Sequence, residues 1–493
     1  MTRIAVDPGR VVGTLNRNVF GGFIEHLGRC IYGGIYEEGS PLSDANDFRA
    51  DVFELLRDLR IGALRWPGGN FASNYHWVDG IGPKGSRPRR PELAWGAEEP
   101  NRFGTDEFMR YCSALGAQPY ICLNMGTGDL DEALGWVEYC NSAGRTYWAE
   151  RRRENGKDTP YCVPYWGLGN EMYGEWQIGA MSADEYAREA TRWARAIRRL
   201  DPNAKLVSCG REGWMEWDRV VLDALTPLVD LHSIHIYSGS DDYWTNVLQP
   251  HQAERAIRSC RALIEHVALN QKLEHPPRIA YDEWNVWYRA MDGGLEERYD
   301  FSDALAVATY LNVFVRNCDW VEMANLAQMV NAIAPIVTTP EAAVVQPIYF
   351  PFLMHSQCAL DLAVDVHVQG PTVAAPDPPP GGRWQYNLRD LGPFSLVDAA
   401  ATVDRSRENL SVALVNRSYE APEEVEIVLR DAGFGDAARV RLLTAGSGTG
   451  PSAVPGVRPA NIEEGSEAAK GSKLVVTMPP QSFAVLEVAM TNS

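Results

Sequence analysis

The sequence lacks several features that would place it in a common class of protein. No uninterrupted apolar run reaches membrane-spanning length, and the N-terminal stretch MTRIAVDPGRVVG has no apolar core typical of a secretory signal. Basic residues are also few, because 46 Lys and Arg against 65 Asp and Glu leave a formal net charge of -19 at pH 7. Nucleic-acid binding needs clustered positive charge. We therefore expect neither a membrane nor a nucleic acid as a partner.

The nine cysteines are scattered and include no Cys-x-x-Cys pair. Their odd number and their spacing predict reduced, mostly buried thiols rather than a disulfide framework. The same spacing offers no paired ligands for zinc, so we expect no metal site. No other cofactor is expected either. Together with the missing signal, the reduced thiols predict a cytoplasmic protein.

Short apolar runs, each followed by polar or glycine residues, alternate with helical patterns over the first 360 residues. This alternation predicts parallel strands joined by helical crossovers. Eight such units, without the glycine fingerprint of a dinucleotide-binding fold, predict a (β/α)₈ TIM barrel at residues 15–360. The runs are VFGGFIEH, GALRWPGGN, QPYICLNMG, YWGLGNE, KLVSCG, LHSIHIYS, RIAYDEWN and EMANLAQMV.

After about residue 360 the pattern changes. Residues 369–384, QGPTVAAPDPPPGGRW, predict a loop, and the short runs beyond it are typical of strands without long helices. They predict an antiparallel, jelly-roll-like β-sandwich at residues 361–493. Residues 1–14 contain the run TRIAVD with no helix after it, and we expect them to add an N-terminal strand to this domain. The C-terminal runs are LSVALVNRS, EVEIVLRD, RVRLLT, KLVVTM and SFAVLEVAM.

Two glutamates lie where a barrel carries its chemistry. Glu171 ends the fourth run, in YWGLGNE, and Glu283 falls in the seventh, in YDEWNVWY. The carboxyl ends of barrel strands meet at one face, so the two carboxylates are expected to converge on one pocket. Such a pair, one protonated and one ionised, is the minimum for cleaving a glycosidic bond. A structural ion pair would explain either glutamate alone, but the two together favour catalysis.

The surroundings of these glutamates suit a sugar. Aromatic rings cover the apolar faces of sugars, while amides and carboxylates bind the hydroxyls. Singly, each tryptophan fits core packing equally well, and Asn70 fits a turn cap. The polar candidates at strand ends are Glu25, Asn70, Asn124, Tyr237 and Gln328, with His26 and His235 as supports, and the tryptophans are Trp66, Trp77, Trp95, Trp176, Trp284 and Trp287.

Four long segments occur in one order along the chain: GGFIEHLGRCIYGGIYEEGS, LRWPGGNFASNYHWVDGIGP, WGLGNEMYGEWQIG and YDEWNVWY. They resemble the signature segments of glycoside hydrolase family 51, which consists mainly of α-L-arabinofuranosidases. The resemblance spans essentially the whole chain. It implies that Glu171 is the general acid/base and that Glu283 is the nucleophile. It also implies that the sugar is held by Glu25, Asn70, Asn170, Tyr237 and Gln346 (in VVQPIYFPF), with Trp95 and Trp287 lining the site.

The activity that this resemblance implies is a retaining, exo-acting hydrolysis through a covalent glycosyl-enzyme intermediate. The substrates would be terminal non-reducing α-L-arabinofuranosyl residues of arabinan, arabinoxylan and their oligosaccharides. Family members are commonly hexamers, so the resemblance implies a homo-oligomer. Two alternatives stay open at this point. One is another glycosidase of the same barrel type, an endo-glucanase or a xylosidase, and the other is a catalytically inactive sugar-binding protein.

Overall fold

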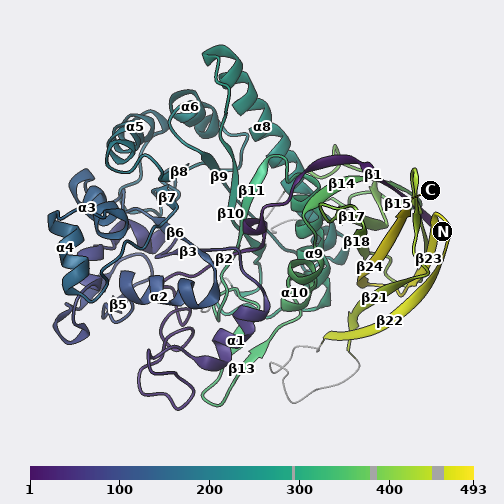
Figure 1. The fold of residues 1–493 in the computed structure, drawn as a ribbon, viewed down its shortest axis with the longest axis horizontal. Coiled ribbons are helices and arrows are strands. Elements are labelled where there is room, and N and C mark those ends of the chain that lie inside the picture. Colours follow the sequence, from purple (N-terminus) through teal and green to yellow (C-terminus); the bar gives the residue numbers. More distant parts are fainter. Residues whose placement is uncertain (291–294, 378–385, 447–459, 493) are drawn as a thin grey trace.

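A computed structural model describes residues 1–290, 295–377, 386–446 and 460–492 (Figure 1). Eight parallel strands close into a barrel whose neighbours follow chain order, with the last strand pairing with the first. This confirms the predicted TIM barrel. Each strand lies within one of the eight apolar runs or extends beyond it by one residue. The strands are β2 (Gly21–Phe23), β3 (Ala63–Trp66), β6 (Gln118–Cys122), β7 (Tyr165–Leu168), β8 (Lys205–Ser208), β9 (Leu231–Ser238), β10 (Arg278–Val286) and β11 (Val321–Ala327).

Helices surround the barrel strands (Figure 1). Helix α5 (Ala183–Leu200) begins after Ser182 with a capping box: the Ser182 hydroxyl accepts from the amide of Glu185, while the Glu185 carboxylate accepts from the Ser182 amide. The α-helices are α1 (Ala50–Asp58), α2 (Thr105–Leu115), α3 (Leu130–Asn141), α4 (Tyr147–Glu154), α5 (Ala183–Leu200), α6 (Glu216–Leu225), α7 (Tyr243–Leu248), α8 (Gln252–Gln271), α9 (Phe301–Arg316) and α10 (Tyr349–Cys358). Short 3₁₀ helices span Arg17–Phe20, Asn70–Asn74, Trp77–Gly80, Lys84–Ser86 and Gln249–His251.

The C-terminal part forms a ten-stranded, mostly antiparallel sheet. Its strand β18 also pairs with β24, so the sheet folds round an aliphatic core. Strand β1 (Thr2–Thr14) lies between β14 and β19, antiparallel to the first and parallel to the second. The described residues after 360 contain no helix. The other strands are β14 (Leu362–Gln369), β17 (Val397–Val403), β18 (Asn409–Asn416), β19 (Glu423–Leu429), β20 (Ala432–Phe434), β21 (Ala437–Ala445), β22 (Ala460–Lys470), β23 (Lys473–Met478) and β24 (Ser482–Asn492).

Three small two-stranded sheets complete the described chain. The hairpin of β4 (Arg90–Glu92) and β5 (Ala97–Glu99) lies in the long connection after β3. The other two sheets pair β12 (Ile336–Thr338) with β13 (Ala343–Val345), and β15 (Thr372–Val373) with β16 (Phe394–Ser395). Of the loop predicted at 369–384, residues 378–384 lie outside the described residues. Within the described residues, no helix is both long and apolar enough to cross a membrane.

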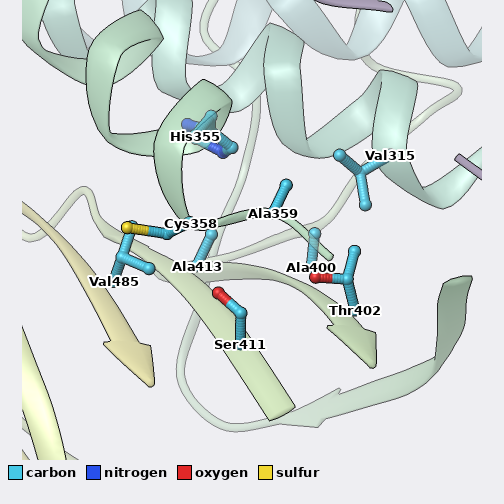
Figure 2. Close-up of a pocket in the computed structure, with 9 residues that line it drawn as sticks. All are labelled: Val315, His355, Cys358, Ala359, Ala400, Thr402, Ser411, Ala413 and Val485. Atoms are coloured by element: carbon cyan, nitrogen blue, oxygen red, sulfur yellow. The ribbon is translucent and has the colours of Figure 1, made fainter. Parts of the chain in front are cut away.

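The barrel and the C-terminal sheet pack directly against each other. Helices α9 and α10 cover strands β17, β18 and β24, and Arg316 of α9 pairs with Asp398 of β17 at 3.0 Å. A small cavity of about 10 Å³ lies at this contact. Figure 2 shows its lining side chains, which include His355, Cys358 and residues of the three strands. A space of that size holds about one water molecule. Burial lowers the pKa of His355 to about 4, which keeps this imidazole neutral at pH 7.

Candidate active site

A cavity of about 600 Å³ opens among the residues that follow the barrel strands. This volume lies in the range of pockets that hold drug-sized ligands. Most of the wall comes from loops after strands, and Trp95 comes from the tip of the β4–β5 hairpin. The main lining residues are Glu25, Asn70, Trp95, Glu171, Tyr173, Trp176, Arg211, Glu212, His235, Tyr237, Glu283, Trp287, Gln328 and Tyr386.

Glu171 lies just after β7, where the backbone turns sharply. Gly169 has φ +78° and Glu171 itself has φ +44°, a left-handed conformation that is costly for a residue with a Cβ. The turn aims the carboxylate into the cavity, where three donors hold it. They are Tyr173 Oη at 3.2 Å, Trp176 Nε1 at 3.1 Å and His235 Nδ1 at 3.0 Å.

Glu283 lies inside β10 and is more deeply buried than Glu171. Its carboxylate accepts from Arg65 Nη1 at 2.9 Å and from Tyr237 Oη at 3.2 Å. Arg65 also donates from Nη2 to Asn170 Oδ1 at 2.6 Å, so one guanidinium holds the nucleophile candidate and the residue before Glu171. Because the guanidinium is always charged, it favours the ionised form of the carboxylate beside it.

His235 lies between the two glutamates. Its Nδ1 is 3.0 Å from a Glu171 oxygen and 3.3 Å from a Glu283 oxygen, and its Nε2 is 3.2 Å from Asp282. Burial alone would lower the pKa of His235, but the charges of Glu283 and Asp282 and the bond to Glu171 raise it to about 10. The imidazole is therefore a cation at neutral pH, with both N–H groups facing carboxylates.

Glu171, His235 and Glu283 are also residue types that bind metal ions. Glu171, His235 and Glu283 each offer one ligand atom, and these atoms lie within 4.8 Å of one another. An ion bound there would have to displace the proton from His235 Nδ1, since imidazole ligates only when that nitrogen is free. The short contacts on both sides of His235 already fit an imidazolium between carboxylates, so the arrangement needs no ion to account for it.

Glu25 forms the centre of a second group of contacts in the cavity. It accepts from the amide of Phe71 at 2.9 Å, from Trp95 Nε1 at 3.1 Å and from Gln328 Nε2 at 3.0 Å. Burial raises the pKa of Glu25 to about 8 in spite of these donors. Glu25 follows β2 and Gln328 follows β11, so this cluster joins the ends of the first and last strands of the barrel to the hairpin.

The structure brings most of the predicted residues together. Glu25, Asn70, Trp95, Glu171, Tyr237, Glu283 and Trp287 line the cavity, and Asn170 lies directly beneath it with its Nδ2 at 3.4 Å from Asn70 Oδ1. Of the other predicted tryptophans, Trp176 also lines the wall, whereas Trp66, Trp77 and Trp284 are fully buried in the core. Asn124 instead donates from Nδ2 to the carbonyl of Tyr75 and accepts at Oδ1 from the amide of Gly126.

Gln346 is the predicted residue that the structure places elsewhere. It is fully buried and does not line the cavity. Its Nε2 donates to the carbonyls of Glu297 and Ala334, and its Oε1 accepts from the amide of Tyr299. With these amide groups satisfied by the backbone, Gln346 supports the segment after β10. In this structure the glutamine at the cavity wall is Gln328.

Several residues of the site went unpredicted. Arg65 and Asp282 carry charges inside apolar strands, and that is the signal that could have found them, because a buried charge needs a partner. Tyr173, Arg211, Glu212 and Tyr386 gave no such signal. They lie in loops, and Tyr386 is more than a hundred residues beyond the seventh strand, so only the tertiary fold brings them to the cavity.

A closed barrel with two facing carboxylates in a cavity with aromatic walls is typical of a glycoside hydrolase. Comparison with known proteins narrows the class. Family models described as the α-L-arabinofuranosidase 1 domain and the α-L-arabinofuranosidase C-terminal domain match residues 55–255 and 282–482. The chain belongs to glycoside hydrolase family 51, a retaining, exo-acting family, and is an enzyme of the α-L-arabinofuranosidase type.

Individual relatives agree with this membership. The probable α-L-arabinofuranosidase C of Aspergillus clavatus is 45% identical over 85% of each chain. An intracellular exo-α-(1→5)-L-arabinofuranosidase of Streptomyces lividans is 38% identical over 87% of this chain and 66% of its own. The α-L-arabinofuranosidase of Thermotoga maritima, solved as an arabinose complex, has a TM-score of 0.89 and 41% identity, covering 99% of this chain and 100% of its own.

Proposed function

We propose that this enzyme removes terminal α-L-arabinofuranosyl units from arabinan, arabinoxylan and their oligosaccharides by double displacement. The observation that carries the mechanism is the closeness of the two carboxylates, whose oxygens lie within 4.8 Å of each other. Retaining glycosidases hold their two carboxyl groups about 5–5.5 Å apart, whereas inverting enzymes need about 6.5–9.5 Å to admit a water between them. The separation therefore supports the retaining mechanism rather than the inverting one.

In the first step Glu283 attacks the anomeric carbon while Glu171 gives its proton to the leaving oxygen. The C–O bond of the glycoside breaks as the ester bond to Glu283 forms. In the second step Glu171, now ionised, takes a proton from water, and the hydroxide displaces Glu283 to release arabinose. Position supports these roles, because Glu283 lies deeper and beside Arg65, whereas Glu171 lies in the more open part of the cavity, which water and leaving groups can reach.

The first step requires the hydrogen bond from His235 to move from Glu171 to Glu283. In the unliganded site burial raises the pKa of Glu283, while the bonds from His235, Trp176 and Tyr173 outweigh burial and lower the pKa of Glu171. The reaction needs the opposite distribution when substrate is bound. Since Nδ1 lies within 3.3 Å of both carboxylates, a small shift of the imidazolium toward Glu283 stabilises the nucleophile as an anion. The same shift weakens the bond to Glu171 and raises its pKa, so the proton that Glu283 gives up is taken up by Glu171.

Asn170 is placed to stabilise the transition state. Arg65 occupies its Oδ1, which orients the side-chain amide and leaves Nδ2 near the cavity, with only a 3.4 Å contact to Asn70. We propose that Nδ2 donates to the 2-hydroxyl of the sugar. Hydrogen bonds at that hydroxyl strengthen as positive charge develops on the ring and contribute several kcal/mol in glycosidases.

Azide rescue tests the two roles separately. In Glu171→Ala, an aryl arabinofuranoside of low leaving-group pKa still forms the covalent intermediate. Azide, which needs no general base, then attacks it and gives the azide of retained α configuration. In Glu283→Ala no intermediate forms, and azide in the vacated space gives the β azide by a single inversion. NMR of the product identifies each anomer.

The expected losses also differ between leaving groups. General acid assistance contributes about 10²–10⁴-fold, so Glu171→Ala should lose that factor on a sugar leaving group and far less on an activated aryl group. A β azide from Glu171→Ala, or an α azide from Glu283→Ala, would reverse the assignment. Full activity in both variants would remove both residues from the mechanism.

A substrate panel tests the proposed specificity. We expect hydrolysis of aryl α-L-arabinofuranoside and of arabino-oligosaccharides, and much slower hydrolysis of aryl β-xyloside and carboxymethyl cellulose. Preference for the xyloside or for cellulose would favour another specificity within the same barrel. Binding of arabino-oligosaccharides without any turnover would indicate an inactive sugar-binding protein.

We further propose a cytoplasmic enzyme that assembles as a homohexamer. The nine free cysteines, eight of them buried, and the intracellular relative in Streptomyces lividans support the location. The family resemblance supports the hexamer. Fractionation of cells and light scattering of the purified protein test the two proposals, and a secreted protein or a monomer would contradict them.

A further inference from the structure

The cavity has two sides, which differ in how their charged groups are satisfied. On one side Glu25 and Glu283 each receive several hydrogen bonds from neighbouring side chains and amides. The other side begins at Glu171 and continues past Tyr173 and Trp176, whose side chain is 61% exposed. This second side lies next to the proton donor, where the leaving group of a glycoside must sit.

Arg211 and Glu212 form the charged part of the second side, and both line the cavity. Among the described residues, neither side chain takes part in a hydrogen bond or an ion pair within 4.0 Å; the Arg211 guanidinium lies 4.9 Å over the ring of Tyr173. Burial raises the pKa of Glu212, and the charge of Arg211 offsets that only in part. Partly burying a carboxylate that has no hydrogen-bond donor costs free energy. A ligand hydroxyl that donates to Glu212 would offset this cost, so Glu212 is a candidate binding group.

The backbone around Glu212 is held firmly by a residue outside the cavity. The buried carboxylate of Asp218 accepts from the amides of Arg211 at 2.7 Å and Gly213 at 2.9 Å, and the carbonyl of Arg211 accepts from the amide of His235 at 2.9 Å. The two residues that flank Glu212 are thus anchored to α6 and β9. The unpaired carboxylate is therefore pre-organised at the wall, which lowers the entropy cost of binding to it.

We propose that Glu212, assisted by Arg211, is the polar contact for the leaving sugar and selects leaving groups that carry a free hydroxyl beside the scissile bond. The carboxylate accepts a hydrogen bond from that hydroxyl, and the guanidinium donates to a ring or hydroxyl oxygen. Tyr386 closes this side from the C-terminal part of the chain. The inference rests on the proposed function, since it assigns the second half of the same substrate. Glycosides with an aryl leaving group lack the hydroxyl and cannot use the contact.

The test compares two substrates in one set of variants. The ratio of kcat/KM for an arabinofuranosyl disaccharide to that for 4-nitrophenyl α-L-arabinofuranoside is measured in wild type, Glu212→Leu and Glu212→Gln. A hydrogen bond to a charged group is worth about 10–100-fold in affinity. We expect the ratio to fall by about that factor in Glu212→Leu. The fall should be smaller in Glu212→Gln, whose amide oxygen still accepts and whose shape protects the fold.

Glu216→Gln is the matched control, because Glu216 lies nearby at the start of α6 but is exposed and paired with Arg219. It should leave the ratio at the wild-type value. A ratio within two-fold of wild type in both Glu212 variants would overturn the leaving-sugar contact alone. A wild-type enzyme that cleaves neither substrate would overturn the proposed function itself, so the two failures are distinguishable.

Discussion

The mouth of the barrel buries a network of charges, whereas the C-terminal sheet buries aliphatic side chains. Arg65, Asp282 and Glu283 are almost inaccessible to solvent within β3 and β10. In the sheet, residues such as Val412 and Leu486 are equally buried and belong to a cluster of mostly aliphatic side chains.

This difference assigns catalysis to the mouth of the barrel and stability mainly to the sheet. Burying charges costs free energy that their mutual attraction only partly returns, whereas each buried aliphatic side chain contributes about 1.5–3 kcal/mol. The charged network therefore serves catalysis rather than stability. The sheet includes β1 from the N-terminus and packs on α9 and α10. Through these contacts it stabilises the barrel that holds the charged network. Four experiments examine this division, in order of decreasing expected effect.

Removing every residue after 365 should leave no soluble folded protein. The cut takes away β19, which pairs with β1, and it uncovers apolar residues of the barrel such as Phe301 and Met354 that pack on the sheet. A broad apolar surface of this kind promotes aggregation. Solubility and thermal unfolding followed by circular dichroism measure the outcome. A soluble truncated chain that unfolds cooperatively would show that the barrel is independent and would contradict the predicted dependence.

Arg65→Met should lower both activity and stability. It removes the guanidinium that pairs with both Asp282 and Glu283, a loss of about 3–5 kcal/mol for a broken buried pair. The loss of fixed charge next to the nucleophile should reduce kcat/KM on the order of 10²-fold or more. Arg316→Met, which breaks the pair with Asp398 at the contact between barrel and sheet, is the control. It should destabilise the fold but keep the kcat/KM of the folded enzyme.

Leu486→Ala should affect stability alone. Leu486 is fully buried in β24, and truncating a core leucine costs about 2–5 kcal/mol. Urea unfolding measures this loss, and kcat/KM at a temperature where the variant is folded should equal the wild-type value. A parallel fall in kcat/KM would mean that the sheet tunes the site directly and that the division between the two interiors is too simple.

His235→Asn should move the pH profile. The wild-type profile of kcat/KM is expected to be bell-shaped, since two interacting carboxylates ionise in separate steps. The cationic imidazole favours ionised carboxylates on both sides of it, so its removal raises the pKa of each and shifts both limbs to higher pH by roughly 1–3 units. His76→Asn is the control, because His76 also pairs with a glutamate, Glu132, but lies outside the cavity lining. Unchanged limbs in His235→Asn would show that His235 does not control the pair.

The prediction of the fold succeeded where the burial pattern is strong. All eight barrel strands lie in the predicted apolar runs or extend beyond them by one residue, because a strand covered on both faces needs continuous apolar residues. Ser182 and Glu185 have the spacing of a capping box, which predicts where α5 begins. The spacing of Trp193, Ile197 and Leu200 predicts its buried face, but Leu200 at its end is 40% exposed. Strands β14, β17, β20 and β22 of the C-terminal sheet were missed. VDAAATV and ANIEEGSEAAK carry weak strand propensity, and β22 is exposed along most of its length, so its pairing with β21 depends on the partner.

By itself the sequence determined that eight strand–helix units form a barrel and that Glu171 and Glu283 end up at its mouth, because apolar periodicity and the place of a charge within a strand are local properties. The contacts round those carboxylates were decided only by the tertiary structure. Arg65 reaches Glu283 across more than two hundred residues, and Tyr386 arrives from beyond the barrel. For the same reason Gln328 lines the cavity wall, whereas the sequence had predicted Gln346 there. Which of two glutamines faces a cavity depends on the backbone groups that each one meets, and those are fixed only when the barrel closes.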